Sequence, residues 1–399
     1  MTEAPVSFPF PKPPSIFHPA PELTRLQLSR PVAEIRLPDG KTGWLVTRFE
    51  DVRRVLIDPR FSRAEASKPG VADTGLGQAS AGSILGLDPP EHTRMRRLVA
   101  GAFTARRVEA LRPRVTALVD ELIDHLQTLP QPADLVENFS LPLPVQVICE
   151  LLGVPPEDRH QFHEWSDAIL GDLTSDPAVA EAGYGRLAAY FGELIARKRK
   201  QPRDDLMTAL VEARDNEDRL TEAELVQLGL TLLVAGHETT ANQINMFLLT
   251  LHEYPGELAR LKARPEYVPE AVEELMRFAQ LGEVGTGLPR VATEEVELSG
   301  VRIPAGAAVI PVLTVANRDP SMIPQPNQLD VTRPQGAHLA FGAGVHHCLG
   351  AQLARMELQE ALSGLLRRLP GLRIETPVDE LDFKQGLFVR SLHALPVRW

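Results

Sequence analysis

Apolar residues recur at helical spacing through most of the chain between residues 90 and 278. The clearest i, i+3, i+4 pattern is formed by six residues: Val115, Leu118, Val119, Leu122, Ile123 and Leu126. Thr221 and Glu224 then have the spacing of a capping box, and the apolar pattern after them continues to about Tyr254. This predicts one helix of roughly 50 Å. Its middle, residues 230–235, is apolar on nearly all sides and is therefore expected to be buried.

Short alternating segments near both ends of the chain predict strands. Residues 32–37 and 43–47 flank a Pro-Asp-Gly turn, and residues 296–298 and 301–303 flank Ser299-Gly300, so each pair is expected to form a hairpin. Residues 383–397 also have an extended pattern, and a helix is predicted from residue 349 to about 369. The fold class that follows is mainly α with a smaller β-rich part built from both ends of the sequence.

No repeat and no clear linker divides the 399 residues, so a single domain spanning 1–399 is predicted, with residues 1–21 as a Pro-rich extended N-terminal segment. A content of 43% hydrophobic and 24% charged residues excludes a mostly disordered chain. A net charge of −11 argues against nucleic-acid binding through a general basic field. The apolar runs are too short for a membrane anchor, and residues 1–21 do not have the pattern of a secretory signal. Two cysteines cannot form a disulfide framework. Together these features favour a cytoplasmic location.

The segment Phe341–Gly350 contains the most informative chemistry, because glycines surround Cys348 where a helix is predicted to begin. Glycine permits unusual backbone angles and the close approach of a flat ligand. Amide groups at a helix N-terminus favour a thiolate, so Cys348 is a candidate nucleophile or metal ligand. The plain alternative is a buried small hydrophobe, and this is the role expected of Cys149.

The pattern Phe-Gly-x-Gly-x-His-x-Cys-x-Gly resembles the haem-thiolate signature of the cytochrome P-450 superfamily, and every fixed position matches. The resemblance implies a cytochrome P-450 fold, a triangular helical body around a buried haem b (iron protoporphyrin IX), with Cys348 as the axial iron ligand. Thiolate ligation favours O–O cleavage of the co-substrate dioxygen. By the same resemblance Phe341 packs beside the ligand sulfur, His346 reaches a haem propionate, and Gly342 and Gly350 belong to the cofactor-binding loop.

Residues 235–240 of the long predicted helix place glycine and hydroxyl residues where they are locally unfavourable. His237-Glu238 begins the zinc-protease pattern H-E-x-x-H, but Ala241 occupies its fifth position, so that metal site fails. The segment instead resembles the superfamily's oxygen-activation motif. That resemblance implies that Glu238 and Thr239 hold water in a helix kink and relay protons.

Two charged groups match further elements of the superfamily. Glu274 and Arg277, at i, i+3, resemble its Glu-x-x-Arg element with Arg333 as third partner, a structural triad that locks the haem-binding core. Without the resemblance, Glu274 and Arg277 would be interpreted as a solvated surface pair. By resemblance the propionate ligands include three further residues: His92, Arg96 and Arg290. Without the resemblance, His92 and Arg96 form a basic surface turn that shares one helix face.

Electrons have to come from outside, because no flavin or iron–sulfur domain is fused to the chain. The resemblance implies a ferredoxin and a ferredoxin reductase, with NAD(P)H as the indirect donor. A basic patch on the cysteine side of the haem is predicted from five arginines: Arg94, Arg97, Arg106, Arg107 and Arg355. The run 197–200 is interpreted as a solvated helix face. We expect a monomer with no nucleic-acid partner and no membrane anchor.

The chain looks similar to actinobacterial enzymes that hydroxylate or epoxidise macrolides and related polyketides in antibiotic biosynthesis, mainly through residues 102–114, 145–154 and 385–392. A bulky apolar substrate is expected to contact eight residues: Leu85, Leu173, Leu232, Ala235, Val284, Gly287, Leu288 and Phe388. The many small side chains in residues 64–87 predict a long loop, which is expected to contact the substrate in this pocket. Terpenoid, fatty or carrier-bound substrates are alternatives within the monooxygenase class. The other classes are a non-catalytic haem sensor, which need not keep Glu238 and Thr239, and a peroxide-driven enzyme, which would replace this acid–alcohol pair.

Overall fold

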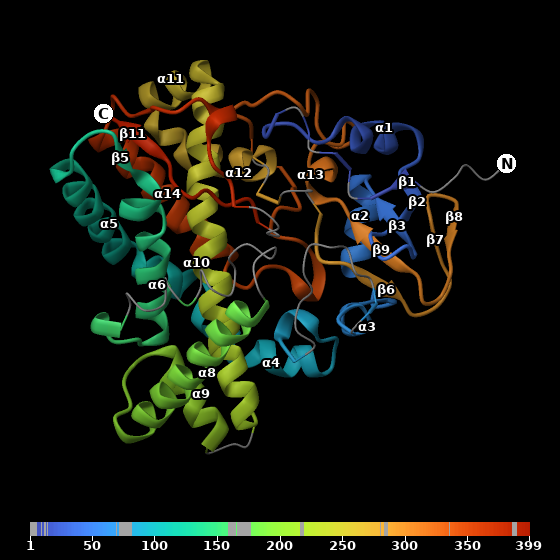
Figure 1. The fold of residues 1–399 in the computed structure, drawn as a ribbon, viewed down its shortest axis with the longest axis horizontal. Coiled ribbons are helices and arrows are strands. Elements are labelled where there is room, and N and C mark those ends of the chain that lie inside the picture. Colours follow the sequence, from blue (N-terminus) through green and yellow to red (C-terminus); the bar gives the residue numbers. More distant parts are fainter. Residues whose placement is uncertain are drawn as a thin grey trace.

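The computed structural model describes residues 6–8, 10–11, 13, 15–68, 70–71, 82–158, 165, 177–215, 219–279, 281–282, 286–334, 336–384 and 389–399 (Figure 1). Its α-helices are α1 Pro21–Ser29, α2 Phe49–Ile57, α3 Arg63–Ala66, α4 Glu91–Ala100, α5 Ala105–Thr128, α6 Pro142–Leu152, α8 Pro177–Lys200, α9 Leu206–Asp215, α10 Glu222–Glu253, α11 Pro255–Ala263, α12 Val268–Phe278, α13 Leu313–Ala316 and α14 Ala351–Arg368. Its strands are β1 Val6–Ser7, β2 Val32–Arg36, β3 Thr42–Val46, β4 Phe61–Ser62, β5 Ala133–Asp134, β6 Arg290–Ala292, β7 Val296–Leu298, β8 Val301–Ile303, β9 Ala308–Pro311, β10 Arg373–Ile374 and β11 Pro396–Arg398.

The long helix α10 passes through the middle of the helical part and packs against α6, α8 and α14 (Figure 1). It begins at the predicted capping box, in which the Thr221 hydroxyl accepts from the Glu224 backbone N–H at 3.2 Å and the Glu224 carboxylate accepts from the Thr221 N–H at 2.8 Å. Every residue from Thr240 to Leu251 is buried. The fully buried part of α10 therefore lies further along the helix than residues 230–235, for which burial was predicted. Within that range, Ala235 faces a cavity described below.

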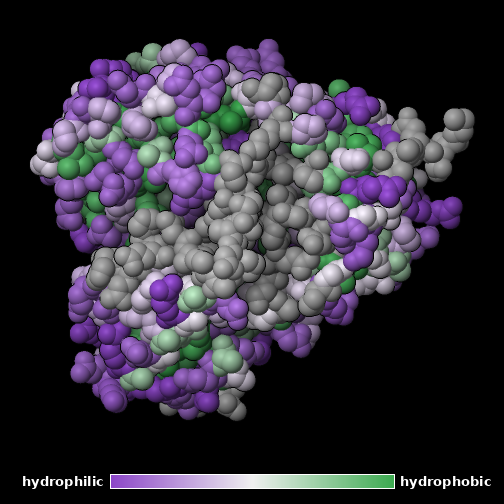
Figure 2. Space-filling view, in the orientation of Figure 1, coloured by the Kyte–Doolittle hydropathy of each residue, from purple (hydrophilic) through white to green (hydrophobic). Residues whose placement is uncertain are grey.

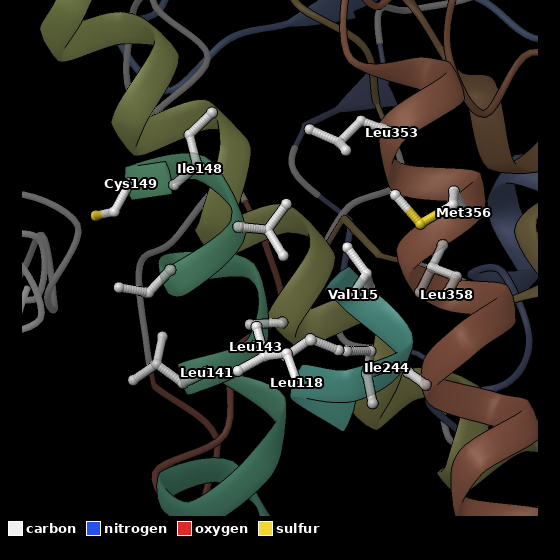
Figure 3. Close-up of a cluster of buried hydrophobic side chains, with 14 of the residues drawn as sticks. Val115, Leu118, Leu141, Leu143, Ile148, Cys149, Ile244, Leu353, Met356 and Leu358 are labelled. Carbon is white, nitrogen blue, oxygen red and sulfur yellow. The ribbon is translucent and has the colours of Figure 1, made fainter. Parts of the chain in front are cut away.

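The helices enclose one large apolar core. Figure 3 shows part of it, where Val115 and Leu118 of α5 lie among side chains from the α6 region, from α10 and from α14. Of the six periodic residues predicted for α5, all except Leu122 are fully buried. Cys149 on α6 has the predicted role of a buried small side chain. This packing fixes α10 against α14, and the two helices then provide walls for the site.

The largest sheet has the strand order β1-β2-β3-β9-β6-β4. The predicted hairpin of β2 and β3 is confirmed, and β9 extends it in parallel to β3. The hairpin of β7 and β8 is also confirmed; Ser299 and Gly300 take φ angles of 46° and 77° at its turn, as a two-residue hairpin requires. This sheet brings β6, and with it Arg290, to the edge of the helical part (Figure 1).

The prediction of a β-rich part built from both ends of the sequence is confirmed, because β6 and β9 join the N-terminal strands. The last strands, β10 and β11, form a separate sheet with β5. Their partner segment lies between α5 and α6, far away in sequence, so no local pattern indicates the pairing. The helix predicted from residue 349 begins two residues later, at Ala351.

The predicted loop 64–87 is partly ordered into short helices. Its first residues belong to α3, and a 3-10 turn covers Ile84–Gly86, while residues 69 and 72–81 lie outside the described residues. Hydrophilic side chains dominate the described surface of the face shown in Figure 2. Within the described ranges, no helix combines the length and the apolar character that a membrane span requires.

Candidate active site

A cavity of about 440 Å³ lies where α10, α14, α4, the start of β6 and residues 341–350 meet. We call residues 341–350 the cysteine loop. The cavity brings together fifteen residues singled out from the sequence: Leu85, His92, Arg96, Leu232, Ala235, Thr239, Arg277, Gly287, Leu288, Arg290, Phe341, Gly342, His346, Cys348 and Gly350. Three other predicted pocket residues, Leu173, Val284 and Phe388, lie outside the described residues.

The cysteine loop is a tight structure that depends on its glycines. Gly342 and Gly344 take φ angles of 69° and 72°, in the left-handed region that favours glycine. A Cβ on Gly344 would lie 2.6 Å from the carbonyl oxygen of Leu56. The loop closes where the Cys348 backbone N–H donates to the Phe341 carbonyl at 2.9 Å. This closure leaves the Cys348 side chain exposed to the cavity.

The expectation that the helix N-terminus favours a Cys348 thiolate stays a prediction, because opposing effects act on this thiol. Burial raises the pKa of the Cys348 thiol, and the opposing effects of the Gly350 N–H and of the Arg96 and Arg355 charges are smaller. The first residue of α14, Ala351, is three positions after the cysteine. Cys348 itself is exposed and lines the cavity. A bound metal ion is the group that deprotonates a thiol in such a place.

Opposite this thiol, the cavity has an excess of cationic and donor groups. His92 Nδ1 and His346 Nε2 are buried, and neither has a hydrogen-bond partner among the described residues. The two rings lie 4.2 Å apart. Arg96 donates to the carbonyl of His347 at 2.6 Å, and Arg290 donates to the carbonyl of Leu288 at 3.0 Å. Neutral carbonyls satisfy these donors without compensating their charge.

The pKa shifts report the same crowding of positive charge. Burial and, to a smaller extent, the nearby charge of Arg63 together lower the pKa of Arg290 to about 9, against the opposing effect of Asp88. Burial, together with the charges of His92, Arg290, Arg63 and Arg96, lowers the pKa of His346 to about 3. A cavity with unpartnered donors and uncompensated cations fits a ligand with buried carboxylates. Haem, a flat ligand with two carboxylates, therefore fits the residues present.

Glu238 and Thr239 lie next to each other on α10 but face different surroundings. The Thr239 hydroxyl lines the cavity and donates to the carbonyl of Ala235 at 2.9 Å. The Glu238 carboxylate is buried outside the cavity lining and accepts from the Asn242 side chain at 2.7 Å. The neighbouring Gly236 allows α6 to approach, because a Cβ there would lie 2.9 Å from Cγ1 of Ile148.

The predicted triad is assembled beside the cavity. Glu274 and Arg277 form a two-pronged ion pair with distances of 2.7 and 2.8 Å, and Arg333 Nε lies 3.2 Å from the same carboxylate. Arg277 also donates to the carbonyl oxygens of Asn317 and Pro326. The surface interpretation of this pair is therefore wrong, because both partners of the pair are buried.

Sequence reasoning missed several cavity residues, and the polar, buried ones among them include Arg63, Gln243 and Glu357. Glu357 is 1% exposed, Oε2 has no partner among the described residues, and burial raises its pKa well above the ordinary value. Glu357 follows Cys348 by nine residues. This spacing places both residues near the start of α14, but it does not predict that the Glu357 side chain is buried. Arg63 belongs to a segment without any distinctive pattern.

Comparison with known proteins identifies the family. The family model described as cytochrome P450 matches residues 187–390. Nocardicin C N-oxygenase of Nocardia uniformis subsp. tsuyamanensis is 48% identical over 398 residues, which is 98% of each chain. The chain belongs to the cytochrome P450 family. As a cytochrome P450, it is a monooxygenase that binds haem iron and uses dioxygen.

Other relatives of this cytochrome P450 cover nearly its whole length. Mycinamicin IV hydroxylase/epoxidase of Micromonospora griseorubida is 48% identical over 94% of each chain. The solved structure of the LnmA cytochrome P450 hydroxylase from the leinamycin pathway of Streptomyces atroolivaceus matches with a TM-score of 0.91 at 44% identity, covering 99% of this chain and 100% of the other. The predicted P450 fold, mainly helical with a smaller sheet part, is thereby confirmed.

Proposed function

We propose that this cytochrome P450 binds haem b in the described cavity through the Cys348 thiolate and oxidises an apolar substrate above it. The observation that carries the proposal is that one cavity contains a reachable thiol, a set of unpartnered carboxylate-binding donors and the apolar face of α10. When bound, the haem supplies the activation of dioxygen. The chain supplies the axial ligand, the orientation of cofactor and substrate, and protons.

Each residue near the cofactor has a separate role in this proposal. His92, Arg96, Arg290 and His346 bind the carboxylates of the haem, because their donors face the cavity without anionic partners. Phe341 packs beside the ligand sulfur. The Arg355 guanidinium lies 4.4 Å from the centre of the Phe341 ring and is held by Glu273 at 2.7 Å, which fixes the ring from its other side.

Proton delivery is proposed to depend on Thr239. Since its hydrogen is used on the Ala235 carbonyl, its oxygen retains acceptor capacity for a water or a substrate hydroxyl in the cavity. Glu238 is proposed to replenish these protons. For this its carboxylate has to leave Asn242 and turn toward the cavity, so the two residues act in sequence rather than as one preassembled pair.

The substrate is proposed to be a macrolide or a related polyketide, which the enzyme hydroxylates or epoxidises. The mycinamicin IV hydroxylase/epoxidase and the monooxygenase PikC of Streptomyces venezuelae, 42% identical over 96% of this chain, support this class. The cavity side of α10 and its neighbours is apolar, with Ile148, Leu232 and Leu288 among the lining residues. Nocardicin C is the second candidate, because its N-oxygenase has equal identity to this chain.

Electrons are proposed to come from a ferredoxin that a reductase supplies from NAD(P)H. Of the five arginines in the predicted patch, Arg94 pairs with Glu224 and Arg355 with Glu273. The other three, Arg97, Arg106 and Arg107, are exposed, and none forms an ion pair within the described part of the chain. Arg97 follows Arg96, which contacts the cysteine loop, so the patch lies close to that loop. The monomeric state and the cytoplasmic location stay predictions.

The test is a titration of the purified haem protein with macrolides, other polyketides and nocardicin C, followed in the Soret band. A low-to-high-spin shift with a macrolide, and oxygenated product with ferredoxin and reductase, are the expected results. A shift with nocardicin C alone would replace the macrolide proposal by N-oxygenation. A carbon monoxide difference spectrum without thiolate character, or a normal one from Cys348→Ser, would refute the assignment of Cys348.

A further inference from the structure

Arg63 and Arg290 form a buried pair of like charges at the edge of the largest sheet. β4 runs antiparallel to β6, with Phe61 opposite Ala292 and Ser62 opposite Val291. Arg63, the first residue of α3, follows β4 directly, and its Nη1 donates to the carbonyl of Pro289, the residue before Arg290. Arg63 is 2% exposed and Arg290 is 4% exposed, and both line the cavity. Like charges that lie close together are destabilising, and burial increases the cost.

The described surroundings satisfy hydrogen bonds of the two guanidinium groups but do not neutralise them. Arg63 Nε donates to the carbonyl of Leu85 at 3.1 Å, and its Nη1 donates to the carbonyl of Pro289. Arg290 donates to the carbonyl of Leu288. No described carboxylate forms an ion pair with either group, so a buried charge of about +2 is left for a ligand to compensate.

Asp88 is the carboxylate near this pair, and its oxygens are already engaged. It accepts hydrogen bonds from the Ser62 hydroxyl and from the backbone N–H groups of Arg63 and Ala64, the latter two at 2.9 and 3.3 Å. Burial lowers the pKa of Arg63 to about 10, and the attraction of Asp88 opposes this only in part. Asp88 thus holds the start of α3 and does not replace a ligand.

We propose that Arg63 and Arg290 together bind one carboxylate group of the haem, so that Arg63 is a further cofactor-binding residue of this enzyme. The inference rests on the proposed haem site at Cys348. A planar guanidinium matches a carboxylate in shape and charge. Arg63 and Arg290 line the same cavity as His346, which lies two residues before Cys348. This neighbourhood favours a carboxylate of the haem over a carboxylate of the substrate as the ligand.

The experiment compares Arg63→Met, Arg63→Lys and Arg390→Met. Arg390 is a suitable control because it is also buried and donates to a backbone carbonyl, that of Ile16 at 2.8 Å, but it is not among the residues that line the cavity. Each protein is reconstituted with haem and with haem dimethyl ester, whose carboxylates are blocked. The readout is the rate of porphyrin transfer to excess apomyoglobin, and circular dichroism establishes that each variant is folded.

Arg63→Met is expected to release haem at least about tenfold faster than the wild type, the factor of one charged hydrogen bond. Arg63→Lys is expected to lie between the two, and Arg390→Met to match the wild type. With the dimethyl ester, wild type and Arg63→Met are expected to release porphyrin at equal rates. Should Arg63→Met fail to fold, Arg63→Lys carries the same comparison.

Equal haem release by wild type, Arg63→Met and Arg63→Lys would overturn the inference. So would an equal acceleration of release with haem and with its ester. Normal haem release, combined with weaker Soret titration by a carboxylate-bearing substrate, would reassign the pair to the substrate. A wild-type protein that binds no haem would refute the proposed function itself, and haem binding by the wild type separates that failure from a failure of the Arg63 assignment.

Discussion

At the scale of single residues, Thr239 and Thr231 are a matched pair on α10. Both hydroxyls donate to the carbonyl four residues earlier, at 2.9 and 2.8 Å, and both residues line the cavity. We expect Thr239→Ala to keep substrate binding but to convert most of the consumed NAD(P)H into hydrogen peroxide, because protons no longer arrive in order. The measurement is the ratio of product to NAD(P)H consumed. Thr231→Ala is the control, and equal coupling in both variants would remove Thr239 from the proton path.

Glu357 allows a prediction about pH. Burial raises its folded-state pKa above the ordinary value of 4.5, so the proton bound to this group favours folding at low pH, and this contribution is lost as pH rises. Glu357→Gln, which keeps the neutral shape, is therefore expected to gain stability over the wild type between about pH 5 and pH 8. Urea unfolding of the haem protein at several pH values measures the difference.

Glu360 provides the comparison on the same helix. Its carboxylate pairs with Arg112 at 2.6 Å and accepts from the Thr116 hydroxyl at 2.8 Å. Glu360→Gln is therefore expected to lose stability at neutral pH, in contrast to Glu357→Gln. A wild type and a Glu357→Gln variant with the same pH profile would show that the Glu357 side chain is ionised in the folded protein.

Some residues of the candidate site could be predicted from the sequence, and others could not. The cysteine loop, His92, Arg96 and Arg290 were found because they belong to spaced motifs, and the structure places them in one cavity. Arg63 and Glu357 are equally buried there but carry no local pattern. What distinguishes them is the lack of water and of a counter-charge, and these properties arise only when distant segments pack together.

At the scale of elements, the triad joins α12 to the segment before the cysteine loop. Arg277→Ala would leave the Glu274 carboxylate buried with only Arg333 beside it. Removing one partner of a buried ion pair costs about 3–5 kcal/mol, so we expect a severe loss of folded, haem-loaded protein. The yield of haem per chain and the urea midpoint measure this.

Arg260 on the neighbouring helix α11 is the control for the triad. Its side chain, about half exposed, lies 3.4 Å from Glu257 and 3.3 Å from Asp330. Arg260→Ala is expected to cost less than about 1 kcal/mol, because water screens such pairs. Similar losses in Arg277→Ala and Arg260→Ala would contradict the structural role proposed for the triad.

Elements were predictable from the sequence to the extent that their signals are local. The capping box at Thr221 fixed the start of α10, and Ser299-Gly300 fixed the turn between β7 and β8. The pairing of β11 with β5 connects segments more than 250 residues apart, so its energy comes from tertiary contacts and not from a local pattern. The kink expected at residues 235–240 stays a prediction, because one continuous helix from Glu222 to Glu253 can still bend.

At the scale of the whole molecule, charge distribution decides which redox partner can approach. The chain has a net charge of −11, so an acidic ferredoxin is repelled unless a local cationic surface opposes the overall field. Arg97, Arg106 and Arg107 are exposed and form no ion pairs in the described structure, and the proposed docking surface consists of them. Because such attraction acts mainly on the association rate, salt is expected to weaken it.

We therefore expect the double variant Arg106→Glu/Arg107→Glu to lower the second-order rate of reduction by an acidic ferredoxin about tenfold or more at low salt, with little difference at high ionic strength. Stopped-flow reduction at several salt concentrations measures this. Lys200→Glu is the control, because Lys200 is an exposed cation at the end of α8, outside the patch. Its single charge change shifts the overall field without touching the docking surface. An equal effect per charge in both variants would mean that only the net charge matters, and it would contradict a docking site at the start of α5.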